Sequence, residues 1–165
     1  MPLEPTEIHL KRPIPEAVEP FAEFALQPAA AFILNGRIRD LALLTFRDEE
    51  AKLWELTDAQ SGAVADALIR SIAEREGAPA IAVVRSVSSP PETSVSPPLE
   101  TPCYGAFNLA VECAAGKQDQ LVGLQSRPNG DQLVIFKRDD PKYRWSRTIT
   151  RGRSTSRDGV PRGEA

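Results

Sequence analysis

The sequence predicts an α+β fold, in which a mostly antiparallel sheet carries one long amphipathic helix and a short N-terminal helix. Three observations lead to this fold class. A capped amphipathic helix is followed at once by a β-branched apolar run, an Asn-Gly pair separates two apolar runs, and apolar and polar residues alternate after a proline-rich segment. Helices and strands that follow one another without a regular βαβ order are typical of this class.

The N-terminal part is predicted to contain an arm and a short helix. Residues 1–14 are expected to form an extended arm, because prolines and charges outnumber the apolar side chains there. The helix is expected at Pro20–Gln27, since proline is tolerated in a first turn, and Pro28 is expected to end it. Phe21 and Phe24 share its apolar face.

The Asn35-Gly36 pair predicts a β-hairpin, because both residues tolerate the positive φ of a two-residue turn. Its strands are expected at Ala30–Leu34 and Arg37–Phe46. An acidic connection, Asp48–Glu50, leads to a third predicted strand at 51–57, whose side chains alternate between two faces.

The long amphipathic helix is predicted from Thr57 to Gly77. Thr57 and Gln60 form a capping box at its start, and Gly77 supplies a left-handed end. At about 100° per residue, one arc of this helix is apolar, so Leu68 and Ile72 at its centre are expected to be buried. The arc comprises Val64, Ala65, Leu68, Ile69 and Ile72.

The second half of the body is predicted to be mainly β-structure. A buried strand is expected at Ile81–Val87, where β-branched residues predominate. Proline, serine and threonine fill Ser88–Pro102, which predicts a long, exposed surface loop; a boundary between subdomains is the alternative. A three-stranded meander should follow, with a turn at Pro128–Asp131 between its last two strands. We therefore expect a single domain over residues 15–138.

Composition excludes several classes of protein. The chain has 165 residues, enough for about one domain with its own core, and no apolar run approaches the roughly 18 residues of a membrane span. The first residues lack the basic and apolar regions of a secretory signal. We therefore expect a cytoplasmic protein without membrane contact.

No motif of a catalytic or cofactor-binding loop occurs, and the single histidine, His9, lies in the arm. We expect no catalytic residue, no metal ion and no cofactor. Two groups of carboxylates, Asp48–Glu50 and Asp139–Asp140, are interpreted as solvated turns. The alternative is that they hold a divalent cation, which would make the protein a small metal-dependent hydrolase or nuclease.

The two cysteines, Cys103 and Cys113, have neither the spacing of a redox pair nor that of a zinc ribbon. Cys113 falls on the apolar face of its predicted strand, so we interpret it as a small buried hydrophobe rather than a nucleophile. Cys103 is expected to be the more exposed thiol. A disulfide between them is the alternative to two free thiols.

The most distinctive chemical signal is a change of charge along the chain. Residues 1–136 contain 11 Lys and Arg against 19 Asp and Glu, a net charge of −8, whereas residues 137–165 contain 9 against 4, a net charge of +5. Residues 139–165 are expected to be a disordered basic tail, whose arginines and aromatics suit phosphates and exposed bases. The candidate binding residues are Arg138, Lys142, Tyr143, Arg144, Trp145, Arg147, Arg151, Arg153 and Arg157.

Together these observations predict a non-catalytic binding or assembly module. Its body is expected to contact a protein partner, and its basic tail to contact nucleic acid or an acidic partner. Docking of the tail onto the acidic body of the same chain is the alternative.

Overall fold

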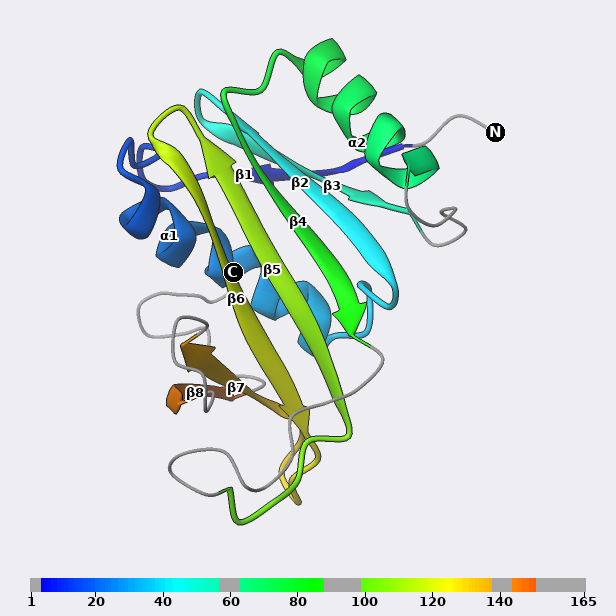
Figure 1. Cartoon of the computed structure of the whole chain (residues 1–165), viewed down its shortest axis with the longest axis vertical. Coiled ribbons are helices and arrows are strands. Elements are labelled where there is room, and N and C mark those ends of the chain that lie inside the picture. The colour runs from blue at the N-terminus through cyan, green and yellow to red at the C-terminus, as the bar shows by residue number, and fades with distance from the viewer. Residues whose placement is uncertain (1–3, 57–62, 88–98, 138–143, 151–165) are drawn as a thin grey trace. The chain divides into compact units, whose positions relative to one another are not determined.

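The computed structural model describes residues 4–56, 63–87, 99–137 and 144–150 of the chain (Figure 1). Eight strands form a sheet in the order β1-β3-β2-β4-β5-β6-β7-β8, and the predicted α+β class with a mostly antiparallel sheet is confirmed. The elements are β1 (Thr6–His9), α1 (Val18–Leu34), β2 (Leu41–Arg47), β3 (Glu50–Glu55), α2 (Ala63–Glu76), β4 (Ala80–Val87), β5 (Gly105–Cys113), β6 (Gly116–Gln125), β7 (Gln132–Lys137) and β8 (Arg144–Thr150).

Two compact units share the chain. The first comprises residues 1–29, 38–85 and 109–119, and the second comprises residues 30–37, 86–108 and 120–165. The sequence predicted one domain, with a subdomain boundary in the proline-rich segment as the alternative. One division between the units falls after Arg85, close to the start of that segment.

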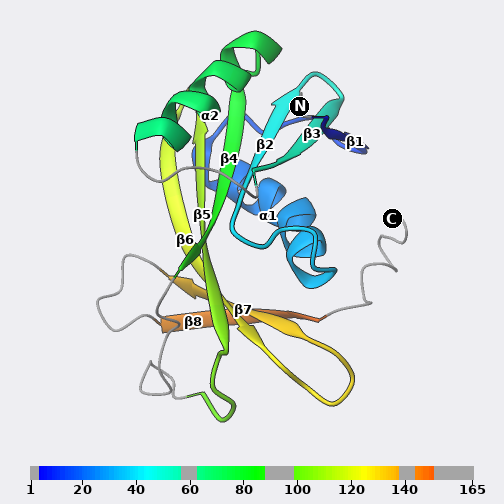
Figure 2. The same ribbon diagram turned by 90° about the vertical axis from the view of Figure 1, so that its right-hand side faces the viewer.

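In the first unit, strand β2 lies between two helices, one on each face of the sheet (Figure 2). On one face, Leu43 belongs to a buried cluster with Ile69 and Ile72 of α2. On the other face, the ring of Phe46 meets that of Phe21 in α1 edge-on, with 5.1 Å between the centroids. Six consecutive residues of β2, Leu41–Phe46, are therefore buried.

The end of the predicted long helix is confirmed, and its start, with Thr57 and Gln60, lies outside the described residues. Gly77 adopts a φ of 63° and donates its N–H to the carbonyl of Glu74 at 3.1 Å. The N–H of Ala78 donates to the carbonyl of Ala73, also at 3.1 Å. These two bonds form a Schellman motif, which satisfies the last carbonyls of α2.

The buried face of α2 differs from the predicted arc. Ile69 and Ile72 are 4% and 1% exposed, so the prediction for Ile72 is confirmed. Leu68 is 36% exposed and Val64 57%, so the prediction that Leu68 lies in the core is wrong. The helix contacts the sheet along the line of Ala65, Ile69 and Ile72, which leaves the other side of the apolar arc in solvent.

The Asn35-Gly36 pair ends a helix, so the predicted hairpin is wrong. Helix α1 continues through Pro28 to Leu34, and with 17 residues it is longer than α2, which has 14. Gly36 has a φ of 83°, and its N–H donates to the main-chain carbonyl of Ile33 at 3.1 Å. The N–H of Arg37 donates to the main-chain carbonyl of Phe32 at 2.9 Å. A Schellman end requires positive φ as much as a hairpin turn does, so the pair alone does not distinguish them.

Burial explains why residues 30–34 are helical. Ala30, Ile33 and Leu34 are 2%, 5% and 7% exposed, and their spacing matches one face of a helix. A proline inside a helix removes one hydrogen bond and costs about 3 kcal/mol. We infer that burial of this last part of α1 offsets the cost at Pro28.

The second unit contains the last part of α1 and is otherwise mainly β-structure. Its predicted turn at Pro128–Asp131 is confirmed by Gly130, whose φ is 119°. A buried cluster joins Leu99, before β5, to side chains of β6 and β7. Leu99 is 8% exposed, so the prediction of an exposed loop is wrong at this residue, whereas Glu100 and Pro102 of the same segment are exposed. Residues 88–98 lie outside the described part of the chain.

Two segments that were expected to lack regular structure contain strands. In the predicted arm, Thr6–His9 form β1, which pairs with β3 so that Ile8 lies opposite Ala51. In the predicted tail, Arg144–Thr150 form β8, which pairs with β7. Short polar segments of this kind become strands when a neighbouring strand supplies hydrogen-bond partners, and the sequence alone does not show that neighbour.

Candidate functional site

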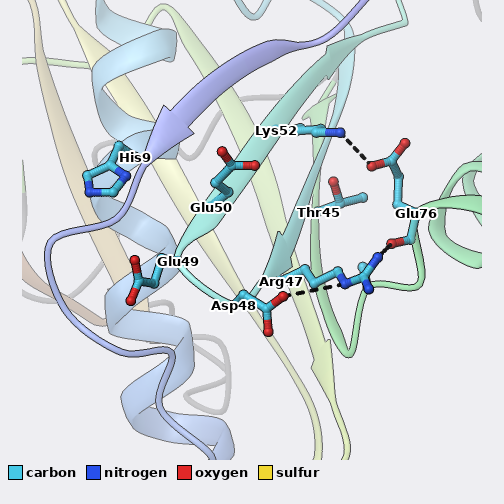
Figure 3. A pocket seen from close by; sticks show the side chains of 9 residues that line it. His9, Thr45, Arg47, Asp48, Glu49, Glu50, Lys52 and Glu76 are labelled. Carbon is cyan, nitrogen blue, oxygen red and sulfur yellow. Dashed lines mark hydrogen bonds and ion pairs between the residues drawn. The ribbon is translucent and has the colours of Figure 1, made fainter.

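A polar pocket lies beside the C-terminal end of α2 in the first unit (Figure 3). It has a volume of about 460 Å³ and is formed by β1, by β2 and β3 with the turn between them, and by the end of α2. The pocket contains the single histidine and one of the two carboxylate groups seen in the sequence. Its lining residues are His9, Thr45, Arg47, Asp48, Glu49, Glu50, Lys52, Glu76 and Ala78.

The pairing of β1 with β3 brings His9 into this pocket, directly opposite Glu50 in the register. The turn before Glu50 contains Asp48 at a φ of 54°, a left-handed conformation that aspartate tolerates better than most residues. Sequence reasoning missed this juxtaposition because it treated residues 1–14 as an unattached arm. The alternation of Glu7 and His9 with Ile8 was the available signal.

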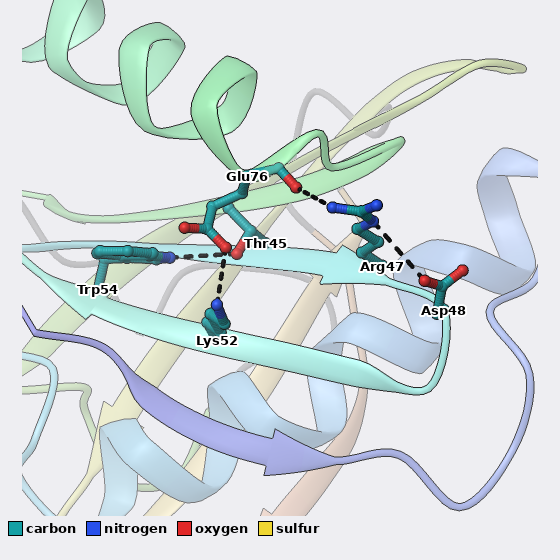
Figure 4. A network of polar contacts seen from close by, with 6 residues as sticks. All are labelled: Thr45, Arg47, Asp48, Lys52, Trp54 and Glu76. Carbon is teal, nitrogen blue, oxygen red and sulfur yellow. Dashed lines mark hydrogen bonds and ion pairs between the residues drawn. The ribbon is translucent and has the colours of Figure 1, made fainter.

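A network of charged groups anchors the end of α2 at this pocket (Figure 4). Lys52 Nζ donates to Glu76 Oε1 at 2.9 Å, and this hydrogen bond raises the pKa of Lys52. Arg47 Nη1 donates to the main-chain oxygen of Glu76 at 3.0 Å, where the helix dipole is negative. Arg47 Nε also lies 3.7 Å from Asp48 Oδ2.

The indole ring of Trp54 lies next to the ion pair of Lys52 and Glu76 (Figure 4). Trp54 Nε1 donates to the buried hydroxyl of Thr45 at 3.1 Å, which satisfies the indole N–H inside the core. The guanidinium carbon of Arg75 lies 5.7 Å from the centroid of the Trp54 ring, within the range of a cation–π contact. The polar side chains of this region thus hold α2 on β2 and β3.

Charged side chains of the pocket contact one another and the end of α2. Both of its permanent cations, Arg47 and Lys52, contact groups of the pocket itself. Among the described residues, no group of three or more His, Cys, Asp or Glu is arranged to hold a metal ion. Asp139 and Asp140 lie outside the described residues. The metal-dependent hydrolase therefore stays an untested alternative.

A second hollow, of about 530 Å³, lies between α2 and strands β4 to β6 in the first unit. Two ion pairs join α2 to the sheet there. Arg70 donates two hydrogen bonds to Glu112, at 2.9 and 3.2 Å, and Arg85 donates to Asp66 at 2.8 Å. The hydrogen bond from Arg70 lowers the pKa of Glu112.

This shift predicts a small loss of stability in acid. The pKa of Glu112 is lower in the folded chain than in the unfolded chain, so its pair with Arg70 contributes fully above the unfolded value of about 4.3. The contribution is lost as the pH falls through the folded value. The side chains of Arg70 and Glu112 are 55% and 34% exposed, so we expect less than about 1 kcal/mol.

Urea unfolding of the parent and of Glu112→Gln at pH 7 and pH 3 measures this contribution. The variant should be slightly less stable than the parent at pH 7, and the difference should shrink at pH 3. Glu100→Gln, which changes an exposed carboxylate outside this ion pair, is the control. A difference between Glu112→Gln and the parent that is equal at both pH values contradicts the prediction.

Three of the nine predicted binding residues are described, and all three are in β8: Arg144, Trp145 and Arg147. Arg147 is exposed. These residues belong to a strand rather than to a disordered tail. The other six predicted residues lie outside the described part of the chain, namely Arg138, Lys142, Tyr143, Arg151, Arg153 and Arg157.

A β-bulge in β8 determines which of its positions share a face. Trp145 lies opposite Phe136, whereas Arg147 lies opposite Ile135, so Ser146 is the extra residue. The Ser146 hydroxyl donates to the carbonyl of Ile135 at 3.5 Å, which ties the bulge to β7.

Because of the bulge, three positions that carry cationic residues fall on the same face of the ribbon formed by β7 and β8. Arg144 lies opposite Lys137, and Arg147 lies opposite Ile135, two residues away along β7. Alternate residues of a strand share a face, so positions 137, 144 and 147 fall on one face of the β7–β8 ribbon. In a regular strand, positions 144 and 147 would fall on opposite faces. The three-residue spacing of Arg144 and Arg147 in the sequence therefore predicted opposite faces, not a shared one.

The predicted order of exposure of the two cysteines is wrong: Cys103 is the more buried of the two. Cys103 is 7% exposed, and burial raises the pKa of its thiol. It packs so closely on β6 that a Cβ added at Gly123 would lie 2.5 Å from its Sγ. Cys113 is only half-buried, and its thiol lies 3.8 Å from the carbonyl of Glu16. Both cysteines are free, and burial makes Cys103 a poor nucleophile.

Comparison of the chain with protein-family models, with curated proteins and with solved structures finds no match. Neither α1 nor α2, the two helices of the described residues, is long and apolar enough to cross a membrane. The function of this chain has to be inferred from its own residues.

Proposed function

We propose that this protein is a non-catalytic binding or assembly module. Its body contacts a protein partner, and its basic C-terminal segment contacts a polyanion, either nucleic acid or an acidic partner. The observation that carries the proposal is the bulge at Ser146, which groups the cationic positions 137, 144 and 147 on one face of the β7–β8 ribbon.

Charge and exposure support this role for β8. The strand contains two arginines and no acidic residue, and Ser146, Arg147, Thr148 and Thr150 are exposed. Arginine forms two parallel hydrogen bonds with phosphates and carboxylates, so a row of such positions suits a polyanion. The segment after Thr150 adds four arginines against two acidic residues, which extends the positive charge along the chain.

Charge reversal on β8 tests this proposal. Binding of a single-stranded oligonucleotide should weaken steeply with salt, because bound cations displace counterions from the phosphates. Arg147→Glu should lower the affinity at low salt and reduce the salt dependence by about one to two counterions. A gel-shift titration at two salt concentrations measures both effects. Arg39→Glu is the matched control, because it makes the same charge change at an exposed residue of the first unit.

A truncation separates β8 from the residues that follow it. The cut belongs after Thr150, because a cut at Arg147 would remove half of a paired strand. If the segment after Thr150 docks on the acidic body, its removal should lower thermal stability without changing oligonucleotide retention. Equal losses of oligonucleotide affinity in Arg39→Glu and Arg147→Glu would show that binding depends only on the net charge of the chain. No binding by the intact chain, even at low salt, would exclude nucleic acid as the polyanion.

A further inference from the structure

Strand β8 is the terminal strand of the sheet. Its backbone pairs with β7 along one side, from the pair Lys137 and Arg144 to the pair Gln132 and Thr150. Among the described strands, none lies on its other side. An edge strand presents a row of backbone N–H and C=O groups along that side, and these groups can pair with another extended chain.

The side chains of β8 leave this edge accessible. Ser146, Arg147, Thr148 and Thr150 are exposed, and Ile149, which lies opposite the buried Leu133, is half-buried. The strand is also long enough for pairing, with seven residues, whereas β1 at the opposite end of the strand order has four. Thr148 and Ile149 are β-branched, which favours the extended conformation that pairing needs.

The positive charge of β8 favours an acidic polypeptide over a second copy of the strand as the partner at this edge. A second copy of β8, paired antiparallel, would bring arginines of both chains close together, and like charges in cross-strand positions are destabilising. Nucleic acid phosphates would neutralise the arginines but cannot continue a backbone ladder. An extended polypeptide with carboxylates at alternate positions does both, because alternate residues of the added strand face the same side as positions 144 and 147.

We propose that β8 is the docking edge for an extended acidic segment of a protein partner, which adds to the sheet as a further strand. The backbone ladder supplies affinity, and pairing of carboxylates with the cationic face supplies specificity. This inference rests on the proposed function and names an acidic polypeptide as the partner of the basic segment.

Three fluorescent nine-residue peptides test the inference by anisotropy on the full chain. The first alternates glutamate with valine, and the second replaces each glutamate by lysine. The third keeps the glutamate and valine sequence but is N-methylated at every residue, so it retains the charges and cannot donate backbone hydrogen bonds. We expect the glutamate peptide to bind at least tenfold more tightly than either of the others. Binding should also slow amide exchange in β8.

Variants of the protein locate the binding. Arg147→Glu should lower the affinity for the glutamate peptide at least tenfold, and Arg39→Glu should leave this affinity within about twofold of that of the parent. Arg147→Lys, which keeps the charge but loses the planar guanidinium, should give an intermediate loss. Circular dichroism and thermal melts establish that each variant is folded.

The other outcomes distinguish failure of this inference from failure of the proposed function. Equal binding of the glutamate peptide and its N-methylated analogue would overturn strand addition and leave a polyanion-binding surface. Salt-dependent binding of an oligonucleotide without binding of the glutamate peptide would assign the surface to nucleic acid. Self-association that sedimentation detects and that protects β8 from exchange would make a second copy the occupant. No binding of either probe at low salt would overturn both proposals.

Discussion

Phe46→Ala is expected to lower the free energy of unfolding by about 3 to 5 kcal/mol. The Phe46 side chain is fully buried in β2, where its ring centroid lies 5.1 Å from that of Phe21 and 6.0 Å from that of Phe24. Truncation removes apolar burial and leaves a cavity between the sheet and α1, which neighbouring side chains fill only in part. Urea unfolding at neutral pH measures the loss.

A milder substitution separates the aromatic contact from burial. Phe46→Leu keeps most of the apolar volume, so it should cost less than Phe46→Ala. A double-mutant cycle of Phe46→Leu with Phe21→Leu should give a coupling of about 0.5 to 1.5 kcal/mol, because the two rings meet edge to face at 85°. A parent-like stability of Phe46→Ala would show that α1 does not pack on this face of β2.

Ile72→Ala is expected to cost about 2 to 5 kcal/mol, whereas Leu68→Ala should cost less than about 1 kcal/mol. Both residues lie on the apolar arc of α2 and differ in exposure, at 1% for Ile72 and 36% for Leu68. Ile72 belongs to the cluster that joins α2 to β2 and β3, and Leu68 does not. Thermal and urea unfolding of the two variants provide a matched comparison on one helix.

The pair of variants tests the orientation of α2 on the sheet. Equal losses for Ile72→Ala and Leu68→Ala would mean that the helix is rotated so that both side chains are buried, as the sequence pattern alone suggested. A loss for Leu68→Ala alone would place the opposite side of the arc against the sheet. Val64→Ala, at a residue 57% exposed, should behave like Leu68→Ala and serves as a control.

Local signals in the sequence were sufficient for several elements. The end of α2 at Gly77, the strand β4 and the turn at Pro128–Asp131 were all predicted close to their observed places. In each case the deciding interaction lies within a few residues, such as a left-handed glycine or a run of β-branched side chains. Nothing distant has to be known to place such elements.

The Asn35-Gly36 pair shows where a local signal becomes ambiguous. Its positive φ is required in a hairpin turn and also at the end of a helix. The outcome depended on the preceding apolar run at 30–34, whose residues are buried as one face of α1. The free energy of that burial is a property of the packed core, so the local sequence did not contain it.

The sequence by itself determined the α+β class, the turn at Pro128–Asp131 and the concentration of positive charge near the C-terminus. Only the tertiary structure decided that β2 is covered on both faces, that His9 lies opposite Glu50, and that positions 144 and 147 share a face. These three features depend on strand pairing and register between segments distant in the sequence or on a bulge of one residue. A shift of one residue in the register of a strand moves its side chains to the other face of the sheet. The register depends on the partner strand, so the spacing of residues in the sequence does not reveal it.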